Sequence, residues 1–203
     1  MKFGVAFSGV CGIASLGVLQ ALEEMEMKAE ALYLNDNSIL PVCLWAAGMK
    51  KERIIERCRK IRKRPAGRNR SFRAIQSEIG RFTPKIKIYL SGKSCDYTTE
   101  KSLFPEVRSL LDSRAAVPEM VEGYREAGRP AETRPQTWPL TGMGCERILL
   151  VSPDCCKVED KCNLHIRLPA YDRGAMEDLR ISDYQGYRAT LSMQKKIYER
   201  LLF

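Results

Sequence analysis

The first 48 residues constrain the fold of this chain most strongly, because short apolar runs alternate with amphipathic segments. In order, they are an expected strand at 3–7, a glycine turn at 8–12, a helix to about 25, a strand at 31–34, a polar turn at 35–38 and a helix at 39–48. This order predicts two parallel strands, each followed by a turn and a helix. Open α/β sheets carry their sites at the carboxyl ends of such strands. We therefore expect any site to lie at these two turns.

The bulk properties predict one globular domain over residues 1–203. Hydrophobic residues make up 44% of the chain and charged residues 29%, which is ordinary for a soluble protein. The net charge of +9 favours contact with an anionic surface. No stretch other than residues 3–22 approaches the length of a membrane span. That stretch contains four glycines and leads into a charged helix, so it predicts a buried strand and helix rather than a signal peptide.

The eight cysteines are scattered along the chain, which favours free thiols in a reducing cytoplasm over a disulfide framework. Cys155, Cys156, Cys162 and His165 cluster in sequence, but no C-x-x-C pair is present. Adjacent cysteines chelate a metal poorly, so we predict no metal centre there.

The chain resembles the patatin-like phospholipases, whose pattern is strand, glycine-rich turn, helix, strand, G-x-S-x-G and helix. The matching stretches are residues 3–9 and 12–24 for the first strand, turn and helix, 44–49 for the end of the nucleophile helix, and 144–152 for a late strand. The resemblance implies a three-layer α/β fold with a mainly parallel central sheet flanked by helices. Further strands are expected at residues 85–90, 148–151 and 164–168. The resemblance also implies lipid acyl ester hydrolysis by a Ser–Asp dyad, without a cofactor.

The residues that would perform this chemistry differ from the family pattern. Alignment without gaps places the nucleophile at Asp36, and the glycines that flank it are absent. The dyad acid falls on Ala127. The oxyanion loop is reduced to Gly9-Val10-Cys11-Gly12, and loss of even one oxyanion donor costs about 3 kcal/mol in the transition state. We therefore expect an impaired hydrolase or a pseudoenzyme that binds lipid or a protein partner.

Three alternatives stay open from the sequence. A rearranged dyad could pair Ser38 with Asp172 as its base, giving an active serine ester hydrolase. Asp36 could itself be the nucleophile, with His165, the single histidine, as the base. Finally, Gly9-x-x-Gly12 after the first strand, with Asp36 after the second, resembles a dinucleotide-binding unit, although the full G-x-G-x-x-G is absent.

The segment Lys50–Arg73 contains twelve Lys or Arg residues and only two acids. Apolar residues at helical spacing (Ile54, Ile55, Cys58, Ile61) predict an amphipathic helix in its first part. A solvated surface is the simpler interpretation of this basic face. The functional interpretation is contact with anionic phospholipid, where each nearby Lys or Arg contributes about 1 kcal/mol. Nucleic acid is disfavoured because few aromatic residues interleave with the charges. We expect a cytoplasmic protein that is peripheral at membranes.

Overall fold

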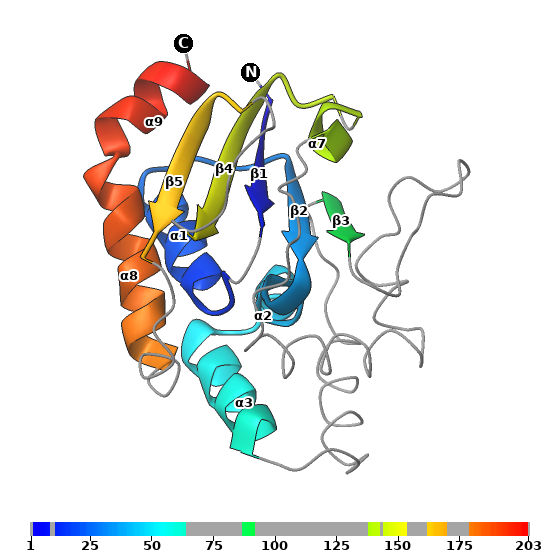
Figure 1. The fold of residues 1–203 in the computed structure, drawn as a ribbon, viewed down its shortest axis with the longest axis vertical. Coiled ribbons are helices and arrows are strands. Elements are labelled where there is room, and N and C mark those ends of the chain that lie inside the picture. The colour runs from blue at the N-terminus through cyan, green and yellow to red at the C-terminus, as the bar shows by residue number, and fades with distance from the viewer. Residues whose placement is uncertain are drawn as a thin grey trace.

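The computed structural model describes residues 2–8, 11–63, 87–91, 138–142, 144–153, 162–169 and 179–202. In this part of the chain, five parallel strands form one sheet in the order β3-β2-β1-β4-β5 (Figure 1). The strands are β1 (Phe3–Phe7), β2 (Ala31–Asn35), β3 (Lys87–Ser91), β4 (Arg147–Pro153) and β5 (Leu164–Leu168). The expected parallel α/β sheet is confirmed. All five expected strands are present: β1 and β5 have the expected ends, and the ends of the other three differ by one or two residues. Residues 85 and 86 lie outside the described part.

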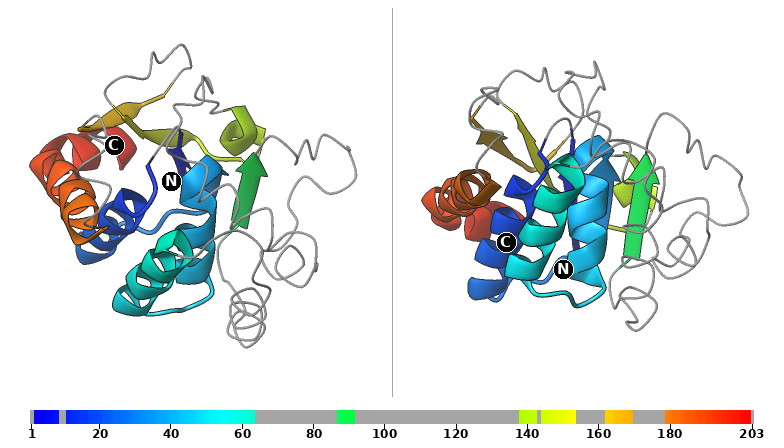
Figure 2. Two further views of the ribbon diagram at one scale, coloured as in Figure 1. Left: turned by 60° about the horizontal axis from the view of Figure 1, so that its bottom comes forward. Right: turned by 90° about the horizontal axis from the view of Figure 1, so that it is seen from below.

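Helices connect and cover these strands. They are α1 (Ala14–Glu24), the 3₁₀ helix η1 (Asp36–Ser38), α2 (Ile39–Ala46), α3 (Lys51–Lys63), α7 (Trp138–Gly142), α8 (Leu179–Ser192) and α9 (Gln194–Leu201). The views in Figure 2 show α1, α2, α3, α8 and α9 gathered on one side of the sheet. Within the described residues, no helix is both long enough and apolar enough to cross a bilayer.

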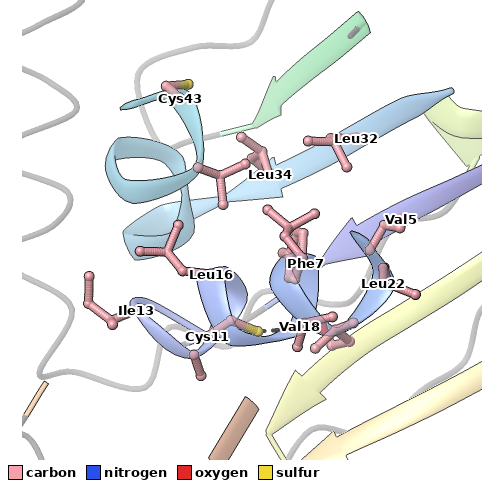
Figure 3. Packing of buried hydrophobic residues seen from close by; sticks show 14 of the residues in the cluster. Val5, Phe7, Cys11, Ile13, Leu16, Val18, Leu22, Leu32, Leu34 and Cys43 are labelled. Atoms are coloured by element: carbon pink, nitrogen blue, oxygen red, sulfur yellow. Dashed lines mark hydrogen bonds between the residues drawn. The ribbon is translucent and has the colours of Figure 1, made fainter. Parts of the chain in front are cut away.

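Two separate clusters of buried side chains occupy the two faces of the sheet. Phe7 and Leu34 belong to the larger cluster, with residues of α1, α2, α3, α8 and α9. Figure 3 shows sheet residues and α1 residues of this cluster packed together. Ala6 and Tyr33, the preceding positions on the same strands, belong to a smaller cluster with Leu140 of α7. Burial on both faces explains why β1, β2 and β4 read as continuous apolar runs rather than alternating ones.

A close crossing of α1 and α8 fixes the beginning of α1. A Cβ atom on Gly17 of α1 would lie only 1.9 Å from the backbone oxygen of Asp183, and one on Gly186 of α8 would lie 2.0 Å from that of Ala14. These positions therefore require glycine for the two backbones to approach so closely. The ammonium of Lys51 lies 2.8 Å from Asp183 Oδ2 and ties α3 to the same crossing.

Candidate functional site

The turns that follow β1 and β2 meet at the carboxyl edge of the sheet. The backbone N–H of Gly12 donates a hydrogen bond to Asn37 Oδ1 at 2.8 Å, and both groups are buried. Gly12 has φ +49°, a left-handed conformation that favours glycine. The two turns expected to share a site are therefore in direct contact, immediately before α1 and α2.

The turn after β2 does not have the geometry of a serine nucleophile turn. Asp36 begins η1, and Ser38 has φ −78° and ψ −20°, so the chain passes from the strand into α2 through ordinary helical conformations. A nucleophile elbow instead needs a sharp, strained turn that exposes the side chain. Among the described residues, Glu26 is the only non-glycine residue with positive φ, and Ser38 is 0% exposed. Ser38, the nearest hydroxyl to the nucleophile position at Asp36, is thus buried rather than exposed.

The shortened oxyanion loop is described only at its ends, since Gly9 and Val10 lie outside the described residues. The Cys11 thiol lies 3.1 Å from the backbone oxygen of Ser8 and 3.4 Å from that of Val151, so it links the ends of β1 and β4. The Gly12 N–H, a donor on this loop, is occupied by Asn37. This donor of the loop is therefore not free to bind an oxyanion.

Two buried polar atoms at this edge have no hydrogen-bond partner within the described part of the chain. They are Ser8 Oγ, just after β1, and Asn37 Nδ2, in η1. A buried polar atom without a partner costs about 1–3 kcal/mol. Such atoms are uncommon in native proteins and call for a specific explanation, such as a bound water, an ion or a ligand.

A serine–histidine contact lies farther along the same edge, and the sequence analysis did not predict it. Ser152 Oγ of β4 and His165 Nε2 of β5 are 2.8 Å apart; Ser152 is fully buried and His165 half-buried. The two residues are 13 positions apart, and only the register of β4 against β5 brings them together. Their presence in two adjacent expected strands was the only sequence signal for this contact.

The alternative catalytic pairs of the sequence analysis are not assembled by the described residues. The strand order places β1 and β4 between β2, which leads into Asp36, and β5, which carries His165. Ala127 and Asp172 lie outside the described residues, so the pair of Ser38 with Asp172 stays a prediction. The described cysteines form no disulfide with one another, and burial raises the pKa of Cys43 to about 12. No group of three potential metal ligands occurs among the described residues.

Helix α3 confirms the first half of the predicted basic amphipathic segment. Its apolar positions Ile54, Cys58 and Ile61 are buried. Its exposed surface includes Arg59 and Lys60. Residues 51–63 contain seven Lys or Arg and two Glu, a formal charge of +5. The remaining part of the segment, residues 64–73, lies outside the described residues.

Charge on α3 is only partly neutralised within the helix. Glu56 lies one turn from Arg59 and Lys60 and is within ion-pair distance of both, at 2.5 and 3.3 Å. The hydrogen bond from Lys60 lowers the pKa of the Glu56 carboxyl, which therefore stays ionised. One carboxylate shared by two cations leaves the outer face of the helix positive.

Neither the models of known protein families nor the curated proteins contain a match to this chain.

Proposed function

We propose that this chain is a patatin-like α/β protein that does not hydrolyse esters through a serine and that adsorbs to anionic phospholipid surfaces through α3. The observation that carries the first part is the turn after β2, a relaxed 3₁₀ turn in which Ser38 is fully buried. A serine in this position cannot reach the carbonyl carbon of an ester without rebuilding the turn.

The contact between Gly12 and Asn37 supports the same conclusion. Ester hydrolysis through a serine develops a negative charge on the carbonyl oxygen, which needs preorganised donors. Here the side-chain oxygen of Asn37 already accepts the hydrogen bond of Gly12 N–H. A substrate oxyanion would have to displace it, and removing one such donor lowers kcat by about 10²–10³.

A fluorophosphonate probe tests the absence of a serine nucleophile. We expect no labelling of the intact folded protein, and no difference between the parent chain and Ser38→Ala. Mass spectrometry of the intact chain reports the adduct directly, and hydrolysis of a short-chain nitrophenyl ester provides a second readout. Stoichiometric labelling that Ser38→Ala abolishes would establish a rearranged dyad and overturn the proposal.

The second part of the proposal rests on the charge and exposure of α3. Arg59 and Lys60 are exposed on its outer face, while its apolar side is buried against the core. Reversing both charges removes about 2 kcal/mol of attraction to an anionic surface, at about 1 kcal/mol for each basic residue, so binding should weaken about 30-fold or more. Screening should reduce this difference as salt increases.

Sedimentation with vesicles of phosphatidylcholine and phosphatidylserine measures this effect. The variant Arg59→Glu/Lys60→Glu is compared with Lys195→Glu/Lys196→Glu, which makes the same charge change at exposed positions of α9. We expect only the α3 variant to lose most of its binding at low salt. Equal losses in the two variants would show that net charge alone, and not α3, governs adsorption.

The strand order supports one other candidate function, the binding of a dinucleotide. The order β3-β2-β1-β4-β5 is also that of doubly wound dinucleotide-binding sheets, which bind at the edge where β1 and β4 diverge. One contact argues against this function: the Gly12 N–H, a donor at the beginning of α1, already donates its hydrogen bond to Asn37. Calorimetric titration with NAD and NADP separates the candidates: saturable binding would favour the dinucleotide function.

A further inference from the structure

A row of polar side chains lies where the strand order of the sheet reverses. The chain continues from β1 to β2 on one side, while β4 and β5 lie on the other. Ligands of open α/β sheets bind in the crevice that such a reversal creates at the carboxyl ends of the strands. Ser8 follows β1, Ser152 lies near the end of β4, and His165 lies on β5, next to β4.

The strand register places these side chains on one face. Phe7 pairs with Val151, and both belong to the larger cluster, which contains α1 and α8. Side chains alternate along a strand, so Ser152 faces the opposite side, as does His165, which pairs with Leu150 of the smaller cluster. The contact of 2.8 Å between Ser152 and His165 agrees with this assignment.

Ser8 continues the pairing of β1 with β4, because its N–H donates to the backbone oxygen of Val151 at 3.0 Å. It follows Phe7 as Ser152 follows Val151, which places the two serines side by side. Adjacent strands are about 4.8 Å apart, so one small ligand can contact both hydroxyls. The Cys11 thiol, close to the backbone oxygens of Ser8 and Val151, holds the two strand ends together.

We propose that Ser8, Ser152 and His165 form a binding site for a phosphate-type oxyanion between the carboxyl ends of β1 and β4. Ser8 Oγ is buried and has no partner within the described residues, so its O–H can donate a hydrogen bond to a ligand. The Ser152 O–H donates a long hydrogen bond of 3.4 Å to the backbone oxygen of Pro153. When His165 donates its Nε2–H to Ser152 Oγ, this O–H can turn from Pro153 to the same anion. Burial strengthens both bonds, because little water competes with the ligand.

The charge around the row suits an anion rather than a cation. Arg167 pairs with Ser152 in the register of β4 and β5 and is exposed at the same edge. Hydroxyl and imidazole donors are also common partners of phosphate oxygens in proteins. This site is distinct from α3 and does not depend on adsorption to membranes.

The single histidine gives a direct measurement of occupancy. His165 contributes the only histidine ring signals to the proton NMR spectrum, so no assignment is needed. Titration with inorganic phosphate at constant pH and ionic strength should shift these signals saturably. Ser8→Ala and Ser152→Ala should each weaken the apparent affinity about tenfold or more, because each removes a hydrogen bond to a charged group. Ser192→Ala, at an exposed serine of α8, should leave it unchanged.

Folding of the variants can be separated from ligand binding. Ser8→Ala removes a buried hydroxyl without a partner in the described part of the chain, so in the absence of phosphate it should be at least as stable as the parent. A second titration uses dihexanoyl phosphatidic acid below its micelle concentration. A stronger response to this lipid than to phosphate would support the site with a lipid headgroup as its source. No saturable shift with either probe, or an equal shift in Ser8→Ala, would overturn the proposal and leave Ser8 with a structural water.

Discussion

Substituting alanine for Gly17 tests the close crossing that positions α1 and its N-terminal turn. The new Cβ would lie 1.9 Å from Asp183 O and 2.6 Å from Tyr187 N, and both of these are backbone atoms that cannot rotate away. Helices α1 and α8 would have to separate by about 1 Å to reach even a tight contact, in a core packed as densely as a crystal. Overpacking of this kind costs about 1–3 kcal/mol and sometimes more.

Alanine is a better helix former than glycine by up to about 1 kcal/mol, which opposes this cost. Because backbone atoms block the new methyl, the upper part of the range applies, and we expect a net loss of about 2 kcal/mol. For a chain of this size, that loss lowers Tm by roughly 4–8 °C. Urea unfolding followed by circular dichroism measures the free energy of unfolding, and an unchanged m-value would show that the unfolded state is unaffected.

Gly142→Ala provides the matched control. Gly142 ends α7, and a Cβ atom there would meet nothing within 4 Å. The same substitution at this position should therefore change the free energy of unfolding by no more than about 0.5 kcal/mol. If Gly17→Ala is as stable as Gly142→Ala, the two helices do not approach as closely as described, and the argument for the position of α1 fails.

Two further predictions concern titratable groups. Burial raises the pKa of the Cys43 thiol to about 12, so at pH 8 only about one molecule in 10⁴ carries the thiolate. Iodoacetamide should therefore leave Cys43 unmodified in the folded protein, which peptide mass spectrometry measures. Rapid modification would contradict the burial of Cys43. Burial raises the pKa of Asp183 above its ordinary value of 3.8 despite its ion pair with Lys51, so the folded protein holds this proton more tightly than the unfolded chain. The free energy of unfolding of the parent relative to Asp183→Asn should therefore fall as pH rises through the range just above 3.8. Urea unfolding at several pH values measures this difference. A difference that increases with pH would mean that the ion pair outweighs burial.

The sequence predicted β1, β2 and β4 well because these strands are buried on both faces, whereas β5 carries the exposed Arg167. Residues 3–7 and 31–34 form continuous apolar runs, and parallel strands covered by helices on both sides have this pattern. The order of the strands in the sheet was harder to predict from the sequence. Nothing in residues 147–153 indicates that β4 pairs with β1 rather than with β3, since that choice depends on packing between segments far apart in the chain. The fold class could thus be predicted from local sequence patterns, whereas the place where the strand order reverses could not.

The candidate site was predicted only in its location. Both turns were expected at the carboxyl edge, and the hydrogen bond from Gly12 to Asn37 confirms that they meet. The contact of Ser152 with His165 was missed because it depends on register, and a shift of one residue would turn the two side chains to opposite faces. Sequence reasoning could identify the single histidine but not its partner.

The contact of Asn37 with Gly12 also explains how such a framework can fold stably without the chemistry that the resemblance implies. A turn that presents free backbone donors to a transition state leaves them without protein partners, and a buried N–H in that condition costs about 1–3 kcal/mol. In this chain the Asn37 side chain supplies the missing acceptor at 2.8 Å. The same residue sits in a relaxed 3₁₀ turn, which avoids the backbone strain of a nucleophile elbow. Both features stabilise the folded chain, and both make an exposed, activated serine harder to form. A donor satisfied by the protein itself is therefore a physical reason not to expect serine ester hydrolysis at this edge of the sheet.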